Sequence, residues 1–202
     1  MTRIIFFMFA MLFLYQCMGW RLVFAQQKSS FTDSRDGRQY KTVRIGSQTW
    51  MAENLIYSGD YEDIGACFGN LTVACELCGK LYNWHEAITA CPSGWHLPSH
   101  AEWATLEKAV GGSSNAGAVL KSKGNWNNNG NNIDRYGFSA LSCGYCDTRG
   151  YCDNLGDITI FWSATEGPNN DAWRWSVNAN NNGIYSGKFN KSNWFSVRCV
   201  KD

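Results

Sequence analysis

The stretch that decides the fold is residues 91–103, which read CPSGWHLPSHAEW. Within it, Ser99 and Glu102 have the spacing of a capping box, in which a hydroxyl and a carboxylate accept hydrogen bonds from N–H groups that a helix leaves free at its start. Apolar residues follow at helical spacing and end at Gly111-Gly112; they are Trp103, Leu106 and Val110. The sequence therefore predicts a helix over residues 100–110, with its tryptophan face toward a core.

The chain before this stretch predicts a second helix and a β-hairpin. Residues 80–90 place Leu81, Trp84, Ala87 and Ile88 on one helical face, and Cys91-Pro92 ends that helix. Further upstream, the side chains of residues 40–45 alternate as those of a strand do, and a Gly46-Ser47 turn leads into a second strand at 48–52. Residues 53–78 are irregular and contain cysteines, so we expect a disulfide-stapled loop there.

The chain after this stretch predicts mainly strands. An Asn- and Gly-rich loop at residues 124–132 precedes a short strand at 136–141 and a second cysteine loop at 143–152; further strands are expected at 158–163, 172–178, 184–189 and 194–200. Asn182-Gly183 is a strong hairpin signal. Trp173, Trp175 and Val177 share one face of their strand, which we expect to be core. Two helices packed on one side of a twisted antiparallel sheet, with long disulfide-stapled loops, predict an α+β fold.

The N-terminus has the features of a signal peptide. Arg3 supplies a positive charge, residues 4–15 are almost entirely apolar, and Val23-Phe24-Ala25 offers a cleavage site before Gln26. The apolar run is shorter than the roughly 20 residues of a spanning helix, so we expect no spanning segment after cleavage. The expected organisation is a signal peptide at 1–25, a polar leader at 26–31 and one domain at 32–202, in a secreted or outer-surface protein. Cys17 leaves lipid attachment open.

Charge and composition exclude some classes of partner. Cleavage removes Arg3 and Arg21, which leaves 16 basic residues against 17 acidic ones and a net charge of −1. Such a balance does not favour nucleic acid or an anionic membrane. Tryptophans are spread along the chain, as is typical of a folded domain rather than a disordered one. The remaining partners are an extracellular glycan or a protein.

Eight of the nine cysteines lie after the signal segment, and an even number in an exported chain favours disulfides. Zinc is the alternative, because residues 75–78 and 143–146 are both CxxC units, but their separation is much longer than in a zinc ribbon. Neither unit opens a helix after a βαβ strand, which argues against a thioredoxin-like redox role. We therefore expect disulfides and no bound metal.

One disulfide can be argued from the expected architecture. Cys91 ends the first predicted helix and Cys199 lies in the last predicted strand. A bond between them would close a loop of more than 100 residues and stabilise the domain by roughly 4 to 5 kcal/mol. Eight cysteines allow 105 pairings, so the partners of Cys78, Cys143, Cys146 and Cys152 stay open.

Several segments can be compared with known families: YKTVRIGSQTWMAENL at 40–55, GKLYNW at 79–84, CPSGWHLPSHAEW at 91–103, YGFSAL at 136–141, FWSATE at 161–166 and the closing FSVRCVKD. In this order they resemble the Fibrobacter succinogenes major paralogous domain. They cover nearly the whole mature chain, and the departures lie in the two cysteine loops. The resemblance implies an exported protein with no established reaction and a fold similar to that of C-type lectins. It also implies the Cys91–Cys199 bond and a Cys67–Cys75 pair.

The sequence offers no apparatus for catalysis and implies no cofactor. The three histidines are His85, His96 and His100, and none has the context of a nucleophile–base pair. We expect His96 to be structural, bonded to nearby backbone, and His100 to be a solvated residue of a helix's first turn. Residues 166–171 supply oxygen atoms that could suit calcium, but a turn-forming surface loop is the simpler interpretation.

The remaining candidate is a binding surface between residues 174 and 194, which is rich in Tyr, Ser, Asn and Trp, as adaptable binding surfaces are. The ligand-binding hypothesis names Arg174, Asn178, Asn180, Tyr185 and Trp194. Such residues can also merely decorate hairpins. We therefore expect a non-catalytic module that binds a glycan or a protein. The alternatives are an enzyme related to formylglycine-generating proteins, which needs reactive cysteines, and a purely structural surface protein.

Overall fold

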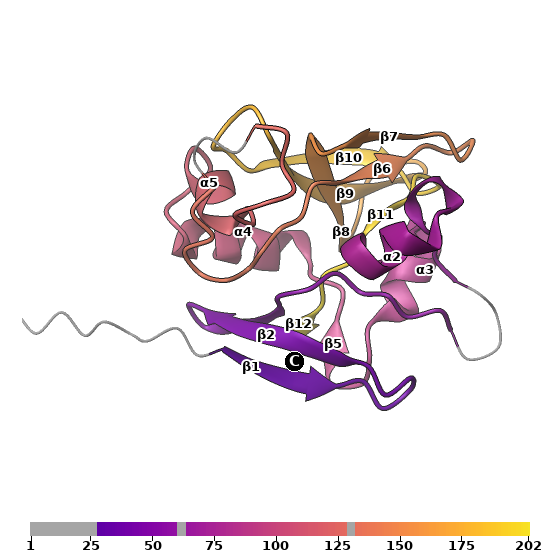
Figure 1. Ribbon diagram of the computed structural model, residues 1–202, viewed down its shortest axis with the longest axis horizontal. Helices are drawn as coiled ribbons and strands as arrows, with labels where there is room; N and C mark the ends of the chain where they lie inside the picture. Colours follow the sequence, from indigo (N-terminus) through magenta and orange to yellow (C-terminus); the bar gives the residue numbers. More distant parts are fainter. Residues whose placement is uncertain (1–27, 60–63, 129–131) are drawn as a thin grey trace, which may run out of the picture.

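The computed structural model describes residues 28–59, 64–128 and 132–202, which form two curled sheets with short helices beside them (Figure 1). The expected signal peptide, its cleavage site and Cys17 lie outside the described residues. Within the described ranges, no helix has the length and apolar character that crossing a membrane requires.

The first sheet joins the N-terminal hairpin to the end of the chain. Its order is β1-β2-β3-β12-β5, with β1 at Lys28–Thr32, β2 at Gln39–Ile45, β3 at Gln48–Met51, β12 at Val200–Lys201 and β5 at Trp95–His96. The predicted hairpin is confirmed as the antiparallel pair β2–β3. Strand β1 includes residues 28–31 of the expected polar leader and pairs with β2. Val200 lies opposite both Trp50 and His96, so β12 holds the hairpin and β5 together.

The second sheet contains most of the C-terminal strands. Its main order is β10-β9-β8-β11-β4, with β10 at Tyr185–Asn190, β9 at Asp171–Asn178, β8 at Ile158–Glu166, β11 at Phe195–Ser196 and β4 at Leu81–Tyr82. The predicted hairpin around Asn182-Gly183 is confirmed as β9–β10. Most pairs are antiparallel, but β11 and β6 (Cys143–Cys146) run parallel to β8. The single strand expected at 194–200 was wrong: β11 belongs to this sheet and β12 to the first.

The two predicted helices are present, with a change at the start of the first. Helix α4, His100–Ala109, has the Ser99–Glu102 capping box and buries Trp103 and Leu106, as predicted. Helix α3, Trp84–Ala90, begins later than expected, because Asn83 and Glu86 form a capping box of their own. Leu81 therefore lies in β4. Ile88, expected on the same helical face as Trp84 and Ala87, is 39% exposed, whereas those two residues are buried.

Other local expectations were wrong because distant contacts decide them. The first cysteine loop contains a 3-10 turn, Phe68–Asn70, and helix α2, Thr72–Cys78. Helix α5, Ala116–Leu120, is buried along its whole length under the loop that follows β9, where the carbonyl of Asn182 accepts from Ala118 N–H. Residues 136–141 contribute only an isolated bridge at Ala140. The second cysteine loop is a hairpin in which β6 pairs with β7, and β7 spans Cys152–Leu155.

The packed interior centres on Trp50, Trp103 and Phe161 on one side and on Tyr82, Trp162 and Phe195 on the other. The buried cation Arg198 lies over the rings of Phe138 and Phe161. Its guanidinium donates to the side-chain oxygen of Asn54 and to the backbone carbonyls of residues 51, 138 and 139. Because a buried cation must be hydrogen-bonded, Arg198 fixes the 136–141 segment against the first sheet.

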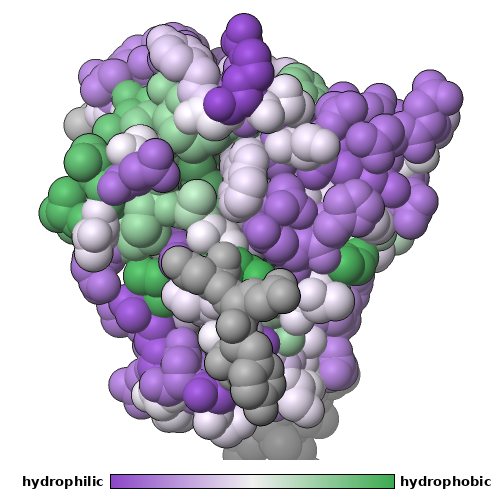
Figure 2. Space-filling view, turned by 90° about the vertical axis from the view of Figure 1, so that its right-hand side faces the viewer, coloured by the Kyte–Doolittle hydropathy of each residue, from purple (hydrophilic) through white to green (hydrophobic). Residues whose placement is uncertain are grey.

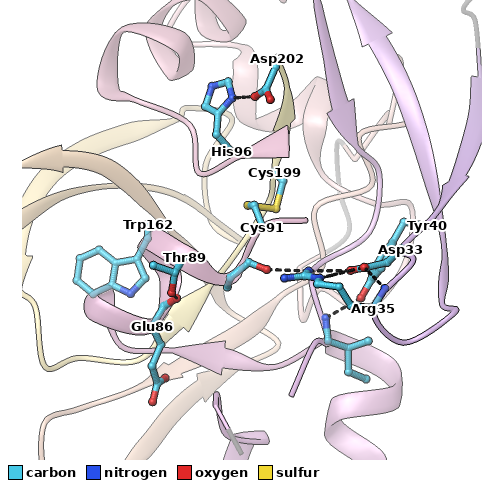
Figure 3. The surroundings of a disulfide bond; sticks show 12 residues. Asp33, Arg35, Tyr40, Glu86, Thr89, Cys91, His96, Trp162, Cys199 and Asp202 are labelled. Atoms are coloured by element: carbon cyan, nitrogen blue, oxygen red, sulfur yellow. Dashed lines mark hydrogen bonds and ion pairs between the residues drawn. A yellow bond between two sulfur atoms is a disulfide. The ribbon is translucent and has the colours of Figure 1, made fainter. Parts of the chain in front are cut away.

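All eight cysteines of the described chain form disulfides. The Cys91–Cys199 bond is confirmed, with Cα atoms 5.9 Å apart, and joins the end of α3 to the last segment of the chain (Figure 3). The Cys67–Cys75 pair is also confirmed. The pairs that the sequence left open are Cys78–Cys143 and Cys146–Cys152. The zinc alternative is therefore wrong: the first of these bonds links one CxxC unit to the other.

The surroundings of the Cys91–Cys199 bond are tied to both ends of the domain (Figure 3). Arg35 Nη2 donates to Asp33 at 2.7 Å and to the carbonyl of Ala90 at 2.9 Å, so the loop before β2 is bound to the end of α3. On the other side, His96 Nδ1 lies 2.6 Å from a carboxylate oxygen of Asp202. The disulfide is thus one of several links between the segment from α3 to β5 and the loop before β2 on one side and the chain end on the other.

Candidate functional site

The structure divides the predicted binding residues between two places. Arg174 and Tyr185 share one face of the β9–β10 hairpin, because Arg174 pairs with Gly187 and Tyr185 lies two residues before that glycine. Phe189, two residues after Gly187, lies on the same face. Tyr185 is 48% exposed and Phe189 37% exposed. Sequence reasoning missed Phe189, although its four-residue spacing from Tyr185 along a predicted strand placed the two on one side.

Arg174 has few partners in the described part of the chain. Its guanidinium carbon lies 4.8 Å from the centre of the Phe189 ring, and Nη1 donates to Ser176 Oγ. Nε is buried without a hydrogen-bond partner, and no carboxylate in the described ranges forms an ion pair with this side chain. Burial without a counter-charge lowers the pKa of Arg174.

The opposite face of β9 belongs to the core and its border. Trp175 and Val177 are buried as predicted, while Trp173 is only partly buried. The ring of His100 contacts Trp173, with centroids 4.0 Å apart and the ring planes tilted by 32°. Its Nδ1 accepts from Trp175 Nε1 at 3.2 Å. Burial lowers the pKa of His100. The expectation of a freely solvated His100 was therefore wrong: it caps the tryptophan pair.

Asn178 and Asn180 shape the loop after β9. Asn178 Oδ1 accepts from the backbone N–H of Asn180 at 3.1 Å, which uses that amide oxygen within the turn. The ammonium of Lys121, whose side chain is buried, donates to the backbone carbonyls of Asn178 and Asn181 at 3.0 and 2.9 Å. These contacts explain the loop's conformation and leave the ligand-binding role of the two asparagines as a hypothesis.

Trp194 lies apart from the other candidates, beside α3. Its backbone N–H and carbonyl both bond to Cys146, which fixes the turn before β11 against β6. The tryptophan lines a hollow of about 570 Å³ together with Ile64, Asn83, His85, Glu86, Thr89, Thr148 and Ser192. Among the residues that the structure describes, no lysine or arginine lines this hollow. Sequence reasoning assigned no role to His85, although His85 and Thr89 are one helical turn apart and therefore share a face of α3.

The carboxylate in the hollow is partly committed to structure. Glu86 Oε2 accepts from the backbone N–H groups of Asn83 at 3.3 Å and Gly65 at 3.2 Å, which caps α3 and holds the loop beside it. The other lining groups are an imidazole, hydroxyls and an amide around one indole. Such a combination can contact the apolar face of a sugar ring and hydrogen-bond its hydroxyl groups.

His96 has carboxylates as partners rather than the backbone groups that the sequence suggested. Its ring bridges Asp202 at 2.6 Å and Glu102 at 2.7 Å, and Glu102 also accepts from Ser99 as part of the α4 cap. Burial alone would lower the pKa of His96, but the hydrogen bonds to the two carboxylates outweigh it and raise the pKa. This charge network fixes the start of α4 to the chain end and is structural.

No metal centre is found among the residues that the structure describes. Within these ranges, no three His, Cys, Asp or Glu side chains gather as metal ligands do. Residues 166–171, considered for calcium, connect β8 to β9, and Glu166 there pairs with Lys191 at 3.2 Å. This segment fits the simpler interpretation of a turn.

The side of the molecule that carries α2 also has an apolar surface (Figure 2). Leu71, at the start of α2, and Val73 and Leu77 within it are 58%, 62% and 63% exposed. On the other side of the helix, Cys75 and Cys78 are buried and form disulfides. The disulfides therefore set which side of α2 faces solvent. This surface differs in character from the polar hollow at Trp194.

In the part of the chain that the structure describes, two curled sheets, short helices and four disulfides form a domain of mixed α and β structure, and so many disulfides fit an extracellular location. Residues 43–201 match the family model of the Fibrobacter succinogenes major domain, and the chain belongs to this family. No curated protein and no solved structure matched the chain. The family assignment therefore depends on the sequence match, and the site on its geometry.

Proposed function

We propose that this chain is a non-catalytic extracellular binding module with a C-type-lectin-like fold, and that it binds a neutral glycan in the hollow beside Trp194. The observation that carries the proposal is the composition of that hollow among the described residues: one indole, one isoleucine, hydroxyl, amide and imidazole groups, a carboxylate that already accepts from two backbone N–H groups, and no lysine or arginine. Its volume of about 570 Å³ is within the range of small-ligand sites and leaves room for more than one sugar ring.

The rigidity of the walls supports this proposal. Trp194 is held by two backbone hydrogen bonds to Cys146, and Cys146 is held by its disulfide to Cys152. His85 and Thr89 stand on α3, whose end is fixed by the Cys91–Cys199 bond. Ordered walls reduce the entropy that binding must overcome. The eight paired cysteines also favour binding over the enzyme alternative, which needs reactive thiols; titration of the folded protein should find none among them.

The test is a glycan array followed by calorimetry with the best neutral oligosaccharide. Trp194→Ala should weaken binding by about 2 kcal/mol, roughly 30-fold, as expected for a central tryptophan contact. Tyr185→Ala is the matched control. It removes an exposed aromatic ring from the end of β10 that is farther from Trp194, so the affinity for the neutral oligosaccharide should stay unchanged. Undiminished binding by the Trp194 variant, or binding only to proteins, would refute the proposal.

A further inference from the structure

The face of the β9–β10 hairpin that carries the exposed side chains of Tyr185 and Phe189 has a second ligand geometry, independent of the Trp194 hollow. Tyr185 and Phe189 are four residues apart on β10, which separates them by about 14 Å along the strand. Arg174 lies midway between them, because its partner across the hairpin is Gly187. The three side chains form a row of ring, guanidinium and ring, which we name the Arg174 ridge.

Gly187 keeps this ridge open. A Cβ at position 187 would lie 3.4 Å from Arg174 Nη2, which is contact distance. Any longer side chain there would extend over the guanidinium and separate it from solvent. The absence of a side chain at residue 187 therefore lets the cation lie flat on the strand between the two rings.

The ridge holds a cation that the described chain does not neutralise. A guanidinium has five N–H donors, and Ser176 Oγ is the acceptor that the structure gives it. A half-buried positive charge without a counter-ion is costly, and an incoming anion would relieve that cost. Lys188 does not share the role, since it lies on the other face, 5.0 Å from the Trp173 ring.

We propose that the Arg174 ridge binds the carboxylate of an acidic sugar, with the rings of Tyr185 and Phe189 contacting the apolar faces of neighbouring sugar units. Guanidinium and carboxylate are both planar, so they pair through two parallel hydrogen bonds. The row of three side chains fits a linear acidic polysaccharide that lies along β10. This site is separate from the neutral-glycan hollow, whose described lining contains no lysine or arginine.

The experiment compares polygalacturonate with fully methyl-esterified polygalacturonate, which has the same backbone without the charge. The full chain should bind the acid form at least tenfold more tightly than the ester, and rising salt should reduce the difference. Arg174→Gln should lower affinity for the acid form about 10- to 100-fold, and Arg174→Lys should restore only part of it, since an ammonium lacks the planar fork. Arg44→Gln removes an equal charge from an exposed strand position and should have no effect.

Testing each variant against both ligands distinguishes this proposal from the one for Trp194. Trp194→Ala should leave binding of polygalacturonate intact, and Arg174→Gln should leave binding of the neutral oligosaccharide intact. If Arg174→Gln does not fold, Tyr185→Ser decides, because this exposed ring can be removed without opening the core and its loss should weaken acid-form binding alone. Equal affinity for acid and ester, or binding to polyglutamate but not to polygalacturonate, would overturn the proposal.

Discussion

Replacing both Cys91 and Cys199 by alanine should destabilise the domain far more than replacing both Cys146 and Cys152. In the chain-entropy relation, the 108-residue separation of the first pair corresponds to about 4.8 kcal/mol at 25 °C, and the 6-residue separation of the second to about 2.2 kcal/mol. The difference arises in the unfolded chain, since the longer loop removes more of its conformations. The larger figure is a substantial share of a domain's usual 5 to 15 kcal/mol.

The assay is urea unfolding of both double variants under non-oxidising conditions, followed by tryptophan fluorescence. The free energies of unfolding should differ by about 2.6 kcal/mol, with similar denaturant slopes. Hydrogen exchange at Val200 adds a local measurement, because β12 joins β3 and β5 and should lose protection first in the Cys91/Cys199 variant. Equal destabilisation by the two pairs would refute the reasoning that the long loop clamps the domain.

Three further changes test the packing and charge arguments, each by urea unfolding. Gly117→Ala should cost about 1 to 3 kcal/mol, because a Cβ there would overlap the carbonyl of Gly183, while Gly124→Ala, with open space around it, should be neutral. Arg198→Met should cost more than about 3 kcal/mol, since it leaves several buried acceptors without a donor. His96→Gln should lose stability mainly below about pH 6.5, the ordinary histidine value, because a raised folded-state pKa stabilises the protonated form and this contribution disappears as pH rises through that pKa. No effect of Gly117→Ala, tolerance of Arg198→Met, or a pH-independent His96 effect would each contradict its argument.

Short-range patterns in the sequence predicted the elements that depend on neighbouring residues. The Ser99–Glu102 capping box predicted α4, and the Gly46-Ser47 turn predicted the β2–β3 hairpin. The Asn182-Gly183 signal predicted β9–β10. These features depend on hydrogen bonds and side-chain spacing within a few residues, so the printed sequence contains the information that fixes them.

Elements whose form depends on a distant partner were not predictable in this way. The segment after Trp194 reads as one strand, but it divides between two sheets because Phe195 pairs with Tyr82 and Val200 with Trp50. Helix α5 is stabilised by its packing under the β9–β10 loop, because its own sequence contains no strong helix signal. Tertiary packing overrides local propensity in such short segments.

The same difference between short-range patterns and distant contacts applies to the candidate sites. The sequence by itself determined the family and, from the expected places of the two cysteines at the end of a helix and in the last strand, the Cys91–Cys199 bond. Only the tertiary structure decided that Arg174 lies between Tyr185 and Phe189, and that Trp194 faces α3 instead. Strand register and sheet order place residues from distant segments together, and neither is encoded in the spacing of residues along one segment.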